Sequence, residues 1–133
     1  MPEAPLAVAL AWVDAANRND PDALVALSAP DVEVVGPRGS VRGAAVLREW
    51  VARAGLTLGT RRAFTRGDAV VLEQRAVWRS PETGEVVGEA DVASRFRVEG
   101  GRVAAYERHD ALGAALRAAG LGEPDEADSA LGL

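Results

Sequence analysis

The sequence predicts an α+β domain in which N-terminal helices pack on one face of a strongly curved antiparallel sheet. Two observations support this fold class. Apolar residues recur at helical spacing near the N-terminus, and from residue 56 onward they alternate with polar residues at strand spacing. A run of helices followed by a run of strands is typical of α+β domains. Such packing tends to leave a cavity between the sheet and the helices, where small ligands bind.

Three helices are expected before the meander of strands. The first spans Leu6 to Arg18, whose apolar residues form a single stripe. The second begins at Asp20, a favourable N-cap, with Pro21 at the first helical position. The third runs from Ala44 to Ala54 and ends at Gly55.

The strands are separated by turns rich in glycine and proline. A short strand is expected from Asp31 to Gly36, and a last short helix from Ala111 to Ala119. Residues 1–121 are therefore expected to form a single domain, and the acidic residues 122–133 a disordered tail. The strands of the meander are expected at residues 61–66, 69–79, 86–98 and 102–109.

Composition excludes several classes of function. The chain has no cysteine, and His109 is its single histidine, so we expect no metal site and no cofactor. Net charge is −5, but four of the twenty acidic residues lie in 122–133, which leaves 15 basic against 16 acidic residues in the body. We therefore expect neither nucleic acid nor a membrane as a partner. With no apolar run of about 20 residues and no signal peptide, the cytoplasm is the expected location.

Several segments together resemble a known superfamily. They are Ala11 to Asp20, Asp31 to Val34, Gly39 to Gly43, Arg48 to Trp50, and Arg95 to Val103. In these segments the chain is similar to the nuclear transport factor 2-like superfamily, and more narrowly to the SnoaL-like branch, which includes bacterial ketosteroid isomerases and polyketide cyclases. The resemblance implies a cone-shaped, curved antiparallel sheet wrapped around the N-terminal helices, the cystatin-like α+β roll. It is specific for fold and weak for function, because the superfamily hosts many activities.

The catalytic residues of the isomerases are not retained. Their helical tyrosine corresponds to Trp12, and their aspartate base, which precedes a proline, corresponds to Gly36 before Pro37. Their protonated aspartate corresponds to Ser94. The resemblance therefore implies the fold of these enzymes without ketosteroid isomerisation.

The resemblance places the candidate catalytic pair near the end of the last strand. Cyclase-like members keep an acid where this chain has Asp110, and Arg108 would orient that acid or hold an anion. Asp110 is also well placed to cap the helix expected from Ala111. If the strand slips by one residue, Glu107 and His109 face the cavity instead. Under the family register, the other residues expected at the cavity are Trp12, Gln74, Trp78, Ser94, Phe96, Ala104 and Tyr106.

Two functions follow from these residues. The first is binding of a small apolar molecule in the cavity, with an isomerase, cyclase or hydrolase activity carried by Asp110. The second is a non-catalytic module whose cavity is filled by its own side chains. By analogy with similar proteins, we expect a homodimer formed through the outer face of the sheet.

Overall fold

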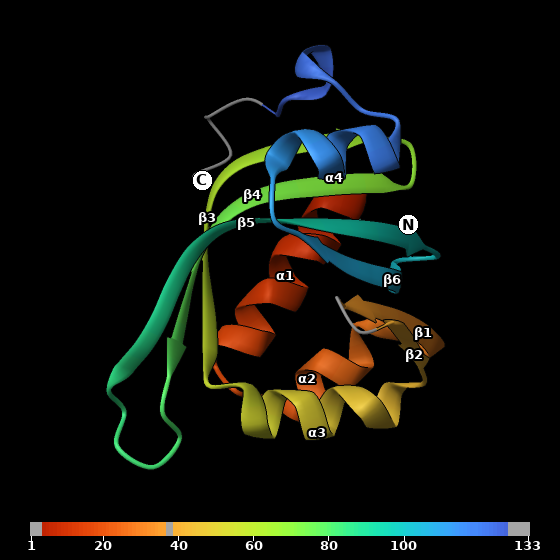
Figure 1. Cartoon of the computed structure of the whole chain (residues 1–133). Helices are drawn as coiled ribbons and strands as arrows, with labels where there is room; N and C mark the ends of the chain where they lie inside the picture. The colour runs from red at the N-terminus through yellow and green to blue at the C-terminus, as the bar shows by residue number, and fades with distance from the viewer. Residues whose placement is uncertain (1–3, 37–38, 128–133) are drawn as a thin grey trace.

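The computed structural model describes residues 4–36 and 39–127, and its centre is one curved sheet of six strands. The strand order is β2-β1-β6-β5-β4-β3. Neighbouring strands are antiparallel except β1 and β6, which are parallel. The sheet curves around the first helix (Figure 1), so the expected α+β roll is confirmed. The strands are β1 (Ser28–Gly36), β2 (Gly39–Arg42), β3 (Leu56–Arg66), β4 (Ala69–Arg79), β5 (Val86–Glu99) and β6 (Arg102–His109).

The first three helices lie on the inner side of the curve. Helix α1 (Pro5–Asn17) runs through the concave face, and α2 (Pro21–Ala26) and α3 (Ala44–Ala54) lie below it (Figure 1). Asp20 caps α2 as expected, since its side chain accepts a hydrogen bond of 3.1 Å from the amide of Ala23. Glycine ends α3 at Gly55, which adopts the left-handed conformation.

Helix α4 (Leu112–Ala119) lies on the opposite, convex face of the sheet. There Ala115 packs with Phe64, Val71 and Ala93 into a small second core, and all four side chains are fully buried. Part of the convex face is thus covered by the chain itself.

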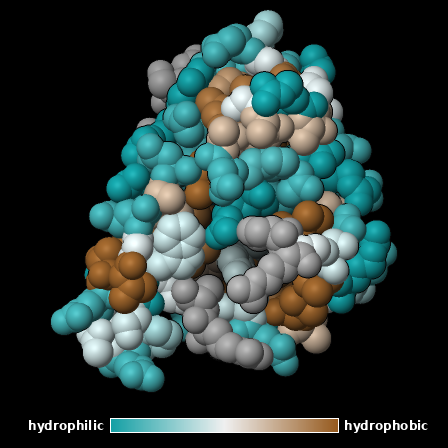
Figure 2. Space-filling model, in the orientation of Figure 1, coloured by the Kyte–Doolittle hydropathy of each residue, from teal (hydrophilic) through white to brown (hydrophobic). Residues whose placement is uncertain are grey.

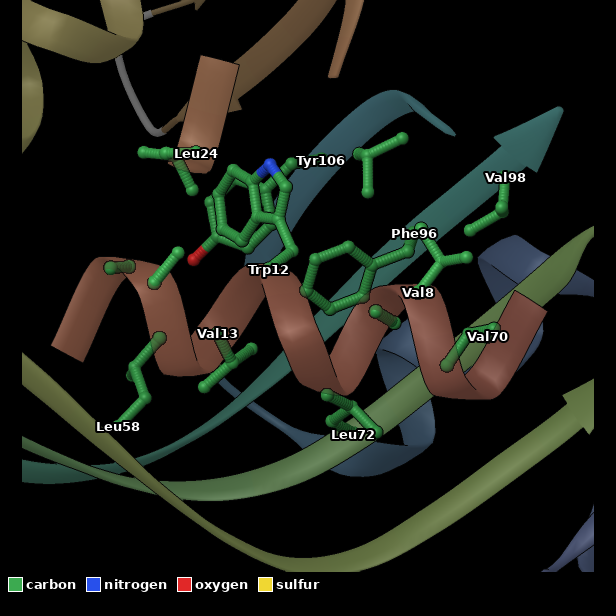
Figure 3. Packing of buried hydrophobic residues seen from close by; sticks show 14 of the residues in the cluster. Val8, Trp12, Val13, Leu24, Leu58, Val70, Leu72, Phe96, Val98 and Tyr106 are labelled. Carbon is green, nitrogen blue, oxygen red and sulfur yellow. The ribbon is translucent and has the colours of Figure 1, made fainter. Parts of the chain in front are cut away.

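The main core lies between α1 and the concave face (Figure 3). Its largest fully buried side chains include Trp12 and Phe96, which face one another from helix and sheet. Alternation in β4 and β5 places every second side chain in this core, because successive strand residues point to opposite faces.

Several boundaries differ from expectation; strand β1, for example, begins at Ser28 rather than at Asp31. Strand β3 starts at Leu56 rather than at residue 61, because its pairing with β4 continues past an irregularity between Thr60 and Arg62. The segment Gly39–Arg42, where no strand was expected, forms the short edge strand β2.

Residues 122–127 are ordered against β3, although the sequence places them in the tail. They include a short 3₁₀ helix (Glu123–Asp125), and the amide of Ala127 donates a hydrogen bond of 2.7 Å to the carbonyl of Ala63. Arg62 donates two hydrogen bonds of 2.9 Å to the carboxylate of Glu126. The rest of the expected tail, residues 128–133, lies outside the described residues. Among the described helices, none has the length and apolar character needed to cross a membrane.

Candidate functional site

The register between β5 and β6 decides which side chains face the helices. Ser94 lies opposite Arg108, and Phe96 lies opposite Tyr106. Since Phe96 and Tyr106 belong to the main core, Arg108 shares their concave face. His109 lies on the other face, where its ring is hydrogen bonded to Glu107. The alternative register, with Glu107 and His109 inward, is therefore not the one observed.

Four aromatic rings fill the middle of the space between α1 and the sheet. The ring centroid of Trp12 lies 4.8 Å from Tyr106, 5.4 Å from Phe96 and 5.9 Å from Trp50. Trp12 has no exposed surface, and Phe96 is 1% exposed. Three residues expected to line a cavity, Trp12, Phe96 and Tyr106, thus belong to the packed core.

A chain of polar groups crosses the sheet beside these rings. The hydroxyl of Ser94 donates a 2.6 Å hydrogen bond to Oε1 of Gln74, and Nε2 of Gln74 donates a 3.1 Å hydrogen bond to Oγ1 of Thr60. Gln74 and Ser94 have no exposed surface, so each satisfies the other within the protein. Ser94 also acts on the nearby hydroxyl of Tyr106.

Burial raises the pKa of Tyr106, because a phenolate would lose its hydration in this position. The hydrogen bond to Ser94 and the positive charge of Arg108 act in the opposite direction without cancelling the effect of burial. Tyr106 is thus a neutral hydrogen-bonding group that lies within the electrostatic reach of Arg108.

Arg108 is half-buried and lies over an aromatic ring. Its guanidinium carbon is 5.6 Å from the ring centroid of Trp78, within the range of a cation–π contact. It forms no ion pair with any carboxylate in the described part of the chain. A guanidinium partly removed from water on the concave face is therefore available to an anion.

Asp110 is not brought together with Arg108. It is exposed in the bend after β6, and no ion pair joins the two side chains. The expectation that Asp110 caps α4 is wrong, because α4 begins one residue later than expected and its N-cap is Ala111 without a side-chain hydrogen bond. The catalytic roles of Asp110 and Arg108 stay predictions.

One member of the polar chain, Thr60, was not singled out from the sequence. The expected strand began at residue 61, which left Thr60 outside it. The alternation of Leu56, Leu58 and Thr60 is the signal that extends the strand and places Thr60 on the concave face. As for metals, the side chains described here contain no group of three or more histidine, aspartate or glutamate residues suited to hold one.

Comparisons with known proteins agree with this architecture. The SnoaL-like domain family matches residues 9–106 of the chain. A putative polyketide cyclase from Sinorhizobium meliloti superposes with a TM-score of 0.65 at 26% identity, over 77% of this chain and 93% of the other. TerC, co-crystallised with polyporic acid, superposes with a TM-score of 0.69 at 22% identity, over 83% of this chain and 93% of the other.

A third solved structure is a protein with a ketosteroid isomerase-like fold from Catenulispora acidiphila, in complex with trimethylamine. It gives a TM-score of 0.67 at 21% identity over 86% of this chain and 93% of the other. At this identity, TerC and the Catenulispora protein show a shared fold alone. No curated protein matches the sequence.

Proposed function

The chain belongs to the SnoaL-like domain family, and from that premise we propose that it binds a small, largely apolar molecule between its sheet and its helices, with Arg108 holding an anionic group of that molecule. The observation that carries the proposal is the half-buried guanidinium of Arg108, which lies on Trp78 and has no carboxylate partner in the described residues.

The energetics of Arg108 favour an anionic ligand. Removing a guanidinium from water is unfavourable unless other groups replace its hydration. The face of Trp78 replaces only part of it, at about 0.5–2 kcal/mol for a cation–π contact. A carboxylate or enolate would add charge-assisted hydrogen bonds to the planar array of N–H donors on Arg108.

Two half-buried rings supply apolar surface for the rest of the ligand. Trp78 on β4 and Trp50 on α3 both pack against the main core while keeping part of their surface exposed. Flat indole surfaces favour a planar ligand.

One of the compared structures supports an acidic ligand, whereas the Catenulispora protein is in complex with a base, trimethylamine. TerC was co-crystallised with polyporic acid, so the fold can accommodate a small acid. The Sinorhizobium protein is described as a putative polyketide cyclase. An isomerase, cyclase or hydrolase activity in this chain would need an acid or base beside the ligand, and Asp110 is the residue that the sequence offers for that role.

A second candidate function is a non-catalytic module with a self-filled interior. The packing of Trp12, Trp50, Phe96 and Tyr106 against one another favours it, because these rings occupy space that a ligand would need. The two functions differ in a simple respect: only the first requires affinity for a small anion.

Calorimetric titration with 2-naphthoate and its neutral carboxamide distinguishes the two candidates. We expect the acid to bind more tightly than the amide, and Arg108→Gln to weaken binding of the acid by about ten- to a hundredfold, since a charge-assisted hydrogen bond contributes about 1.5–3 kcal/mol. Arg97→Gln, on the convex face, is the matched control and should leave affinity unchanged. Equal affinities in wild type and Arg108→Gln, or no binding of the acid, would favour the self-filled module.

We also propose that the part of the convex face left uncovered by α4 forms a homodimer interface. Charges of both signs alternate there, with Arg75 close to Asp91 and Arg95 close to Glu107. Such a pattern can complement itself across a two-fold axis. Sedimentation analysis should show a dimer that Arg95→Glu weakens, and a monomer at all concentrations would contradict the proposal.

A further inference from the structure

Strand β3 is the outermost strand on one side of the sheet, so one of its edges has no neighbouring strand. The backbone N–H and C=O groups on such an edge need partners, and an extended chain that lies beside them can supply these by adding a strand. Two parts of the same chain lie against this edge, namely Asn17 and the C-terminal segment, residues 122–127.

The first half of the edge is closed by the side chain of Asn17, at the end of α1. Its Oδ1 accepts a hydrogen bond of 2.8 Å from the amide of Leu58, and its Nδ2 donates one of 2.9 Å to the carbonyl of the same residue. Beyond Leu58 the register of β3 is irregular between Thr60 and Arg62. The part of the edge that an extended chain can occupy is therefore Arg62–Arg66.

The C-terminal segment is held on that part of the edge mainly by charge. Arg62 donates a hydrogen bond of 2.9 Å to each carboxylate oxygen of Glu126. It donates a further one of 3.4 Å to the carboxylate of Glu123. Arg66 lies 3.5 Å from the carboxylate of Asp125. Two arginines of β3 thus bind three acidic side chains of the segment.

The C-terminal segment is an incomplete partner for a strand. In the described part of the chain, its backbone pairing with β3 is one isolated bridge, between Phe64 and Glu126. The amides of Asp125 and Glu126 bond within the segment's own 3₁₀ turn, and Pro124 has no amide hydrogen. The ion pairs are partly exposed and therefore weak. An acidic chain that is extended over the same part of the edge would form more contacts than this segment does.

The charge of the edge selects among possible partners. A second β3 strand would bring Arg62 and Arg66 close to the same two arginines of the other copy, which is unfavourable. The C-terminal segment of a second copy would form the same incomplete set of contacts and gain nothing by exchange. On the side of the molecule in Figure 2, which includes α4 and the C-terminal segment, hydrophobic residues form only small separate groups among hydrophilic ones. Carboxylates and backbone groups of a different chain suit this edge best.

We propose that the edge Arg62–Arg66 is a docking site for an acidic, extended segment of another protein, and that the chain's own C-terminal segment occupies the site until such a partner displaces it. Arg62 and Arg66 bind the carboxylates of the partner, and the backbone of Ala63 pairs with its backbone. The site lies at an edge of the sheet, whereas Arg108 lies on the concave face. The inference therefore does not depend on the proposed function.

The test measures binding of a labelled peptide to the full chain by fluorescence anisotropy. The probe is Gly-Glu-Val-Asp-Glu-Ala-Gly, which copies the C-terminal segment with valine in place of proline, so that it can extend and donate at that position. One comparison peptide keeps the proline, and another has glutamine and asparagine in place of the acids. We expect the valine peptide to bind more tightly than either.

Two variants break the same ion pair but should differ in affinity for the valine peptide. Glu126→Gln loosens the chain's own segment and leaves the docking site intact, so it should raise affinity by about two- to fivefold, the range of one partly exposed ion pair. Arg62→Gln loosens the segment but also removes a docking arginine, so its affinity should be lower than that of Glu126→Gln. Arg97→Gln, on the convex face, is the matched control and should bind like the wild type.

Three results would overturn the proposal. Equal affinity of Glu126→Gln and Arg62→Gln for the valine peptide would show that Arg62 takes no part in binding it. Equal binding of the acidic and the amide peptides would show that charge does not select the partner. Absence of binding of the valine peptide to Glu126→Gln would show that the edge serves only the chain's own segment.

Discussion

Trp12 and Ser28 are joined by a buried hydrogen bond of 3.0 Å, in which the indole Nε1 of Trp12 donates to Oγ of Ser28. The hydroxyl of Ser28 in turn donates to the carbonyl of Leu24 at 2.8 Å. The contact connects the middle of α1 to the end of α2 and the first residue of β1. It also satisfies the one polar atom of an indole that is otherwise surrounded by aromatic rings.

Ser28→Ala should destabilise the protein by about 1–3 kcal/mol, because it leaves the indole N–H of Trp12 buried without an acceptor. Urea denaturation measures this change. In the Trp12→Phe background, where there is no N–H to satisfy, the same serine substitution should have a much smaller effect. Additive effects of the two substitutions would contradict a direct energetic coupling between the residues.

Alkaline pH should destabilise the protein through Tyr106. Its pKa is raised above the usual 10.0 by burial, so the unfolded chain loses the phenolic proton before the folded protein does. This contribution to stability is complete below the unfolded pKa and is lost as pH rises through the folded pKa.

The composition makes this titration simple to follow. Tyr106 is the only tyrosine, and the chain has no lysine. Phenolate absorbance and urea midpoints from about pH 8 to pH 12 should therefore report one group. Tyr106→Phe should remove most of the alkaline loss, and a wild type that titrates at the usual value would contradict the burial described here.

Substitution of two left-handed glycines by alanine should have unequal effects. A Cβ at Gly55 would lie 2.2 Å from the carbonyl oxygen of Arg79, whereas a Cβ at Gly120 would meet nothing within 4 Å. Both residues have positive φ, so Gly120→Ala should cost about 1–2 kcal/mol. Gly55→Ala should cost several kcal/mol, since the backbones of Gly55 and Arg79 are hydrogen bonded and cannot separate freely. Comparable urea midpoints for the two variants would contradict this difference.

Acid should release the C-terminal segment from β3. The hydrogen bonds and charge of Arg62 lower the pKa of Glu126 below its usual 4.5. The contribution of this pair to docking is therefore present above 4.5 and is lost as pH falls through the folded pKa of Glu126. Hydrogen exchange of the Ala127 amide, which is bonded to Ala63, measures docking directly.

Glu126→Gln provides the matched control for this prediction. The variant keeps the shape of the side chain but not its charge, so Ala127 should exchange faster at neutral pH and with less dependence on acid. Added salt should act in the same direction on the wild type, because the pair is partly exposed. Protection of Ala127 that is identical in both proteins would show that the backbone bond alone holds the segment.

The concave face could be predicted residue by residue from the sequence. In β4 and β5, alternation determines which side chains share a face, and the register implied by the family resemblance placed Gln74, Ser94 and Phe96 on the inner one. The same register placed Arg108 inward and His109 outward, with the reverse left open until the pairing of β6 was known. Alternation does not show which group a polar side chain will bond to. The hydrogen bond from Gln74 to Thr60 depends on the irregular register between β3 and β4.

The convex face and the C-terminus could not be predicted in this way. Phe64, Val71 and Ala93 come from three strands, and only the assembled sheet brings them together beneath α4. Arg62 and Glu126 are 64 positions apart, in a chain with 15 arginines and 20 acidic residues. Sequence alone does not select one such pair among many. Asp110 does not cap α4, because the backbone of Ala111 is still extended and the helix begins only at Leu112.

The parallel pairing of β1 with β6 makes folding depend on the end of the chain. Strands β3 to β6 each pair with the next in sequence, so they can form as local hairpins. Strand β1 can pair locally with β2, but this pair joins the rest of the sheet only when Arg102–His109 has left the ribosome. Until then the apolar side chain of Val32 cannot be buried in the main core. Exposed apolar surface on the first helices and β1 of the nascent chain is prone to aggregation. From this topology we expect the meander to form first and closure of the sheet by β1 and β2 to be the late step.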